Sequence, residues 1–85
     1  MYREARAESL KRDKHQCQFP GCKKKRSLQS HHIRRYADYP ILAHSAKNLI
    51  TLCYDCHKRV TGHEDDYVGL FFSILASKLN DTSNN

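Results

Sequence analysis

The chain has 85 residues, enough for one domain but for only a small hydrophobic core. Its 15 Lys and Arg residues against nine Asp and Glu residues give a formal net charge of +6, which favours a polyanionic partner because contacts to phosphates release counterions. The longest apolar stretch, 68–76, is too short to cross a bilayer, and the charged N-terminal segment lacks a signal-peptide pattern, so we expect neither a membrane-spanning nor a secreted protein.

The first half of the chain predicts a helix, a tight turn and a strand. Residues 2–13 are rich in good helix formers and indicate a short, largely solvated helix. The segment from Cys17 to Cys22 has Pro-Gly at its tip, a turn signal that lets both sulfurs point toward one centre. Residues 27–33 then indicate a strand, and 34–47 a long irregular connection. A connection of that length in a small domain usually has a function.

The second half predicts a buried strand and two helices. Residues 48–52 are apolar and β-branched, as in a short buried strand. A short helix over 55–61 is followed by a second helix over 65–79, which has one apolar stripe at three- and four-residue spacing. The stripe consists of Val68, Phe71, Phe72, Leu75 and Leu79. We therefore expect a single domain, residues 1–85, with a core at about 15–64 and a helix on either side of it.

The four cysteines form two short-spaced pairs. They are Cys17-x4-Cys22 and Cys53-x2-Cys56. Structural zinc takes four ligands in a tetrahedron, and in a reducing cytoplasm paired cysteines hold metal more often than they form disulfides. The spacing therefore predicts a closed zinc site that contributes folding free energy and leaves no open position for catalysis. Two disulfides, four inert thiols, or a ligand set that includes His15 or His57 are the alternatives.

A second set of polar residues points to a separate reactive site. Two adjacent histidines, His31 and His32, end the first predicted strand. Asn48 precedes the second strand, and His57 lies on the helix that follows. Neighbouring side chains on a strand point to opposite faces, so one imidazole could bind a metal ion while the other acts as a base beside it. Zinc bound to Cys56 would bring the three histidines toward one cleft.

These residues carry a family resemblance. The segments HHI at 31–33, NLITLC at 48–53 and CHKRVTGHE at 56–64 resemble the HNH nucleases, particularly the small phage-type ones with two cysteine pairs. The resemblance runs from about Cys17 to Glu64, more than half of the chain. It implies an α+β fold of the ββα-metal (His-Me finger) type, in which two antiparallel strands and a helix surround one divalent ion.

The resemblance also implies roles for individual residues. His31 matches the first protein ligand of the ion and His57 the second, while His32 matches the general base that activates water. Asn48 matches the asparagine that braces the long loop and the strand that holds the base. Some relatives have a further histidine one helical turn after His57, where this chain has Thr61. Two protein ligands then remain, with Mg²⁺ or Mn²⁺ expected as the working ion.

The implied activity is metal-dependent endonucleolytic hydrolysis of DNA, by nicking or double-strand cleavage. The alternative is a zinc-dependent module that binds DNA or serves as an adaptor and cuts nothing. We expect a monomer in the cytoplasm, or in the host bacterial cytoplasm if a phage encodes it. This monomer could work within a larger phage DNA-processing complex. The basic residues expected to contact DNA are Arg34, Arg35, Lys58, Arg59, Lys24 and Lys25.

Overall fold

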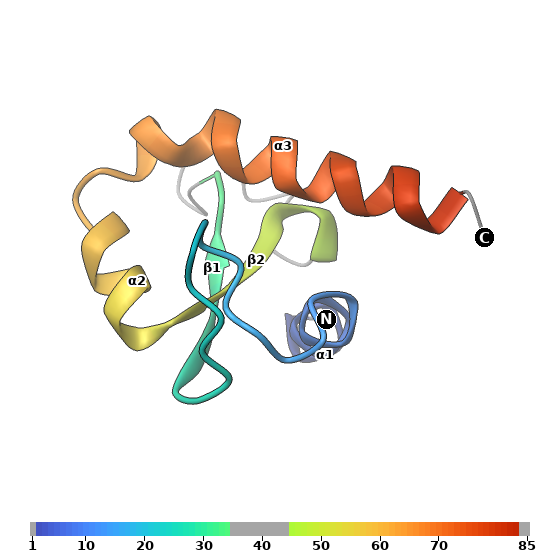
Figure 1. The fold of residues 1–85 in the computed structure, drawn as a ribbon, viewed down its shortest axis with the longest axis horizontal. Coiled ribbons are helices and arrows are strands. Elements are labelled where there is room, and N and C mark those ends of the chain that lie inside the picture. The colour runs from blue at the N-terminus through green and yellow to red at the C-terminus, as the bar shows by residue number, and fades with distance from the viewer. Residues whose placement is uncertain (1, 35–44, 84–85) are drawn as a thin grey trace.

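The computed structural model describes residues 2–34 and 45–83 (Figure 1). In these two ranges the chain forms three α-helices, two strands and one 3₁₀ turn. In chain order they are α1 (Tyr2–Arg12), β1 (Leu28–His32), η2 (Ala46–Asn48), β2 (Leu49–Cys53), α2 (Tyr54–Val60) and α3 (Glu64–Ser83). The order of a strand pair followed directly by a helix is the ββα arrangement, so the predicted α+β fold class is confirmed.

The two strands form an antiparallel pair in which His32 lies opposite Leu49 and Leu28 lies opposite Cys53. All five residues of β2 are buried, because α1 and α2 pack on either side of it. Figure 1 shows α1 and α2 on opposite sides of the strand pair, with α3 running along one edge of the molecule past both. The sheet therefore fixes where β1 ends and where α2 begins.

The apolar stripe predicted on the last helix closes the core. Phe71 is fully buried and Leu75 nearly so, and Val68 and Phe72 pack against the same cluster. The cluster also contains Ile33 of the segment after β1, three residues of β2 and Val60 of α2. Burial of such side chains contributes about 1.5–3 kcal/mol each. The side chain of Leu79 lies outside the described residues.

The element boundaries differ from the predicted ones by small amounts. β1 starts after Ser27, whose φ of 53° lies in the left-handed region and does not continue a strand. Asn48 belongs to the 3₁₀ turn rather than to the second strand, and α2 begins at Tyr54 without a loop. α3 extends to Ser83, four residues beyond the predicted end, since no Gly or Pro interrupts it there. Most of the predicted connection, 35–44, lies outside the described residues.

Candidate active site

The four cysteines, far apart in the sequence, lie together in the structure. Their sulfur atoms are all within 4.8 Å of one another, and none forms a disulfide. Cys22 lies in a turn closed by a hydrogen bond from its own backbone N–H to the Phe19 carbonyl, 2.9 Å, with Gly21 at a φ of 83°. Cys53 ends β2 and Cys56 lies in the first turn of α2. The direct passage from β2 to α2 therefore places the second pair against the first.

The geometry and charge of this cluster fit a structural metal such as zinc. Zinc–sulfur bonds of about 2.3 Å in a tetrahedron place the sulfurs roughly 3.8 Å apart, and the sulfurs of Cys22 and Cys53 are 3.8 Å apart. Burial raises the pKa of the Cys17 and Cys56 thiols. Burial acts the same way on Cys53, but hydrogen bonds from the Cys56 backbone and the neighbouring thiols outweigh it and lower that pKa to about 7. Three of the four cysteines are buried, and as thiolates the four would need a cation to balance their charge.

A second cluster forms where β1 meets α2. The rings of His31 and His57 meet edge to face with their centroids 5.4 Å apart, and Phe71 of α3 approaches His31 at 5.5 Å. His31 is 5% exposed, and its Nε2 atom is buried without a hydrogen-bond partner. Burial, followed by the nearby charge of His57, lowers the pKa of His31 from 6.5 to about 4. A neutral imidazole with a free nitrogen is the form that binds a metal ion.

The protonation of His31 is open to direct measurement. We expect NMR titration of the protein without added divalent ion to give His31 a pKa of about 4, because burial disfavours the imidazolium. The unfolded chain takes up this proton below pH 6.5 and the folded chain only near pH 4, so His31 makes the free energy of unfolding fall as the pH drops through this window. A His31 imidazole that titrates at or above pH 6.5 would contradict the buried position.

Asn48 fixes the chain just after the second histidine of β1. Its side-chain oxygen accepts a hydrogen bond from the Arg34 backbone N–H at 2.9 Å, and its side-chain nitrogen donates to the Arg34 carbonyl at 3.0 Å. Its backbone carbonyl accepts from the Ile33 N–H at 2.8 Å. Asn48 itself is 1% exposed, whereas His32 is half-buried and so reachable from solvent. Three hydrogen bonds thus anchor the two residues that follow His32.

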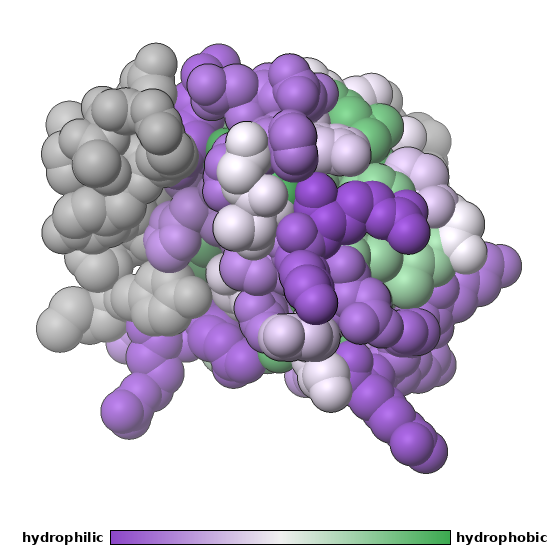
Figure 2. Space-filling view, turned by 90° about the vertical axis from the view of Figure 1, so that its left-hand side faces the viewer, coloured by the Kyte–Doolittle hydropathy of each residue, from purple (hydrophilic) through white to green (hydrophobic). Residues whose placement is uncertain are grey.

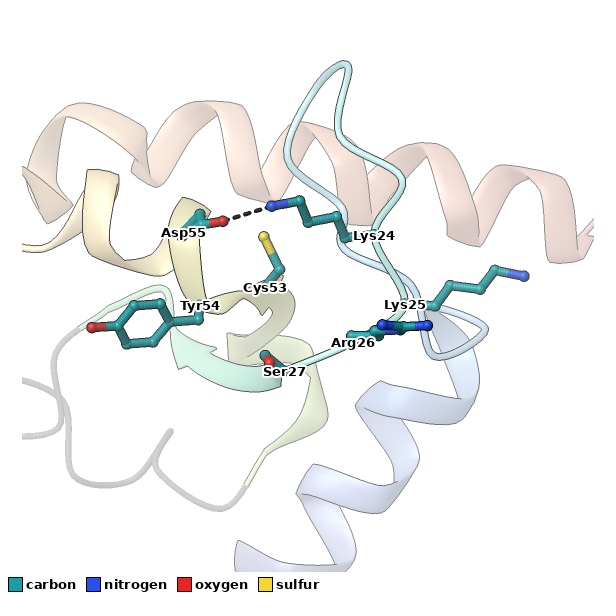
Figure 3. Close-up of a pocket in the computed structure, with 7 residues that line it drawn as sticks. All are labelled: Lys24, Lys25, Arg26, Ser27, Cys53, Tyr54 and Asp55. Atoms are coloured by element: carbon teal, nitrogen blue, oxygen red, sulfur yellow. Dashed lines mark hydrogen bonds and ion pairs between the residues drawn. The ribbon is translucent and has the colours of Figure 1, made fainter.

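The basic residues lie in several different environments. Lys24 and Asp55 form an ion pair of 2.6 Å at the edge of an open hollow, and Lys25, Arg26 and Tyr54 also line this hollow (Figure 3). The side chains that line it come from the segment before β1 and from the junction of β2 with α2.

Three of the other predicted contact residues lie near α2 and α3. The guanidinium of Arg59 lies over the Phe19 ring at 5.4 Å, and that of Arg34 lies over the Phe72 ring at 5.6 Å. Lys58 is exposed on α2, and Arg35 lies outside the described residues. Figure 2 shows a mostly hydrophilic surface on the side of the molecule where α2 lies.

Four residues near the histidines or the strand pair could not be identified as part of the site from the sequence. Phe71 was predicted only as core, yet its ring contacts His31. The charge of Glu64 favours protonation of His31, and its carboxylate accepts a hydrogen bond from the Gly62 N–H. Arg12 and Asp13, predicted as part of a solvated helix, contact the strand pair through side-chain hydrogen bonds. No local sequence pattern distinguishes these residues from core or surface positions.

A comparison with protein families supports the same region of the chain. The family model described as HNH endonuclease matches residues 15–62, more than half of the sequence. The match spans both cysteine pairs, the strand pair and α2. A search of curated proteins and a search of solved structures each found no match. Among the described residues, no helix is long and apolar enough to cross a membrane. The chain therefore belongs to the HNH endonuclease family.

Proposed function

We propose that this protein is a metal-dependent DNA endonuclease in which His32 activates water and His31 and His57 bind the divalent ion. The buried His31 ring carries the proposal, since its Nε2 atom has no hydrogen-bond partner and His57 lies beside it. A buried polar atom without a partner costs about 1–3 kcal/mol. A cation bound at this nitrogen would remove that cost.

Two different metals would then serve two different purposes. Zinc at the four cysteines is structural, because four thiolates leave no open position for water. Mg²⁺ or Mn²⁺ is the proposed working ion at His31 and His57, with water and phosphate oxygens as its other ligands. When bound, this ion would polarise the scissile phosphate and stabilise the charge that develops on the leaving oxygen.

The proton chemistry falls to His32. Its imidazole accepts a proton from a water molecule, whose oxygen forms a new bond to phosphorus. The bond from phosphorus to the 3′ oxygen breaks, and this oxygen leaves with the electron pair and takes a proton from solvent. Asn48 supports the step by holding the chain after His32 in one conformation. The products are a 3′ hydroxyl and a 5′ phosphate.

The proposed DNA surface includes the exposed basic side chains around α2 and the open hollow. Lys25 and Lys58 are exposed and suit phosphate contacts, whereas Lys24 is already paired with Asp55. Arg34 and Arg59 could each contact the backbone beside the ring over which they lie. Arg35 is proposed from its place in the sequence alone. Contacts of this kind would bind DNA of any sequence, because phosphates carry no base information.

Cleavage of supercoiled plasmid tests the activity. We expect the zinc-loaded protein to give nicked or linear product with Mg²⁺ or Mn²⁺ and none with EDTA. The His57→Ala variant should need at least roughly tenfold more metal ion for the same rate, because even residues outside the ligand shell change metal affinity by that factor.

The control is His63→Ala, which removes an imidazole that is exposed beyond the end of α2. It should cut like the unmodified protein. If the plasmid stays intact with every divalent ion while the zinc-loaded protein still binds it, the chain is a non-catalytic DNA-binding or adaptor module. Equal metal requirements in the two variants would instead remove His57 from the proposed ligand set.

A further inference from the structure

The Arg12–Asp13 pair at the end of α1 forms a dense side-chain hydrogen-bond network. The Arg12 guanidinium donates two hydrogen bonds to the Asp13 carboxylate, both 2.8 Å long. It donates two more to backbone carbonyls, to Ala46 at 2.7 Å and to Leu49 at 2.6 Å. The Asp13 side chain is completely buried, and Lys78 of α3 approaches it at 3.8 Å. A buried carboxylate held this way is rigid.

This network covers the free edge of β2. Among the residues that the structure describes, β2 pairs with β1 on one side only, so its other edge presents backbone groups that need partners. Arg12 donates to the Leu49 carbonyl, Asp13 accepts from the Thr51 N–H at 3.0 Å, and the Gln18 N–H donates to the Thr51 carbonyl at 2.9 Å. The end of α1 and the segment after it therefore take the place of a third strand.

The two carbonyls that Arg12 holds lie on either side of Asn48, whose side chain anchors Arg34. One of them belongs to Leu49, the residue directly opposite His32 in the strand pair. Arg12 is therefore linked to the chain around His32 by two routes. One passes through Asn48 to the residues after His32, and the other passes through Leu49 across the sheet.

We propose that Arg12, held by Asp13, is a positioning residue for His32, an inference that rests on the proposed role of His32 as general base. Both residues precede the segment that the family model matches, which starts at residue 15. The guanidinium is needed because its planar fork can bind a carboxylate and two carbonyls together. A lysine ammonium would keep the charge next to Asp13 but could not hold both carbonyls in the same geometry.

The Arg12→Lys variant tests this in two independent measurements on the full, zinc-loaded chain. In NMR spectra, the imidazole resonances of His32 should shift, whereas those of His57 should stay, because the four side-chain hydrogen bonds of Arg12 described above go to Asp13, Ala46 and Leu49, and none of these residues belongs to α2. In plasmid cleavage, kcat should fall roughly tenfold with KM within twofold, since small displacements of a catalytic group cost rate rather than binding. Combined with Asn48→Ala, the two losses should be less than multiplicative.

Ser9→Ala is the matched control for a merely structural effect. Ser9 is fully buried on α1, and its hydroxyl donates only to the Arg6 carbonyl, so its loss disturbs the packing of the helix but not the Arg12 network. The Ser9→Ala variant should leave the imidazole resonances of His32 unchanged, and kcat should also stay the same. If it lowers kcat as much as Arg12→Lys does, the positioning role is wrong.

A second variant covers the case in which Arg12→Lys does not fold. Asp13→Asn keeps an acceptor for the Thr51 N–H but weakens the hold on Arg12, and it should shift the His32 resonances in the same direction by a smaller amount. Unchanged His32 resonances in a folded Asp13→Asn or Arg12→Lys protein would overturn the proposal. Because this readout needs no cleavage, it remains decisive even if the chain proves not to be a nuclease.

Discussion

Replacing Cys53 with serine should unfold the chain at room temperature. Cys53 is 1% exposed and lies at the junction of β2 with α2, so a metal ion bound to its sulfur would tie the turn at residues 17–22 to both elements. A structural zinc site supplies about 10–16 kcal/mol of apparent binding free energy, which matches or exceeds the total stability of about 5–15 kcal/mol that native domains have. Replacement of Cys53 leaves three thiols, two of them buried, and no closed four-cysteine site.

The measurement is thermal unfolding by circular dichroism, with the zinc content taken from native mass spectrometry. We expect the Cys53→Ser protein to bind no zinc and to show no cooperative transition, and a strong zinc chelator should have the same effect on the unmodified protein. The control is Ser30→Ala in β1, since the Ser30 hydroxyl oxygen is buried without a hydrogen-bond partner and its loss should not lower stability. If the Cys53→Ser protein binds no zinc and still unfolds at the same temperature as the Ser30→Ala variant, the structural role of the cysteine cluster is refuted.

The fold could be predicted closely because its signals are local. The spacing of each cysteine pair already defines a turn that gathers two sulfurs, and the apolar stripe on the last helix has a helical period. The burial of Phe71 and Leu75 follows from that period. Boundaries were less accurate, because they depend on single backbone conformations. The left-handed φ of Ser27 and the 3₁₀ turn before Leu49 have no strong signal in the residues themselves.

The candidate site was only partly predictable. The proximity of His31 to His57 followed from the cysteine pairs, since β2 and α2 carry one pair and β1 begins six residues after the other. The hydrogen-bond network of Arg12 and Asp13 could not be predicted in this way. It joins the end of α1 to backbone groups 34 to 38 residues later, and an Arg-Asp dipeptide in a charged helix is ordinarily solvated. Long-range side-chain contacts to backbone leave no periodicity in the sequence.

Replacing His32 with alanine should reduce plasmid cleavage by roughly 10²–10⁴-fold, the usual contribution of a general base. The ring is half-buried at the end of β1, so its loss removes little of the core and leaves the cysteine cluster and Asn48 in place. The decrease should therefore be in kcat, with KM for DNA within about threefold because the proposed phosphate contacts lie elsewhere. Single-turnover cleavage at saturating Mg²⁺ or Mn²⁺ measures the chemical step directly.

Gln29→Ala is the matched control, because Gln29 is another half-buried polar residue of the same strand. It should cut at the unmodified rate, and both variants should keep full zinc content and the same unfolding temperature within a few degrees. The comparison then isolates proton transfer from strand stability. His32→Ala protein that is folded, zinc-loaded and as active as the control would assign the base to another group, whatever the metal requirement of the reaction.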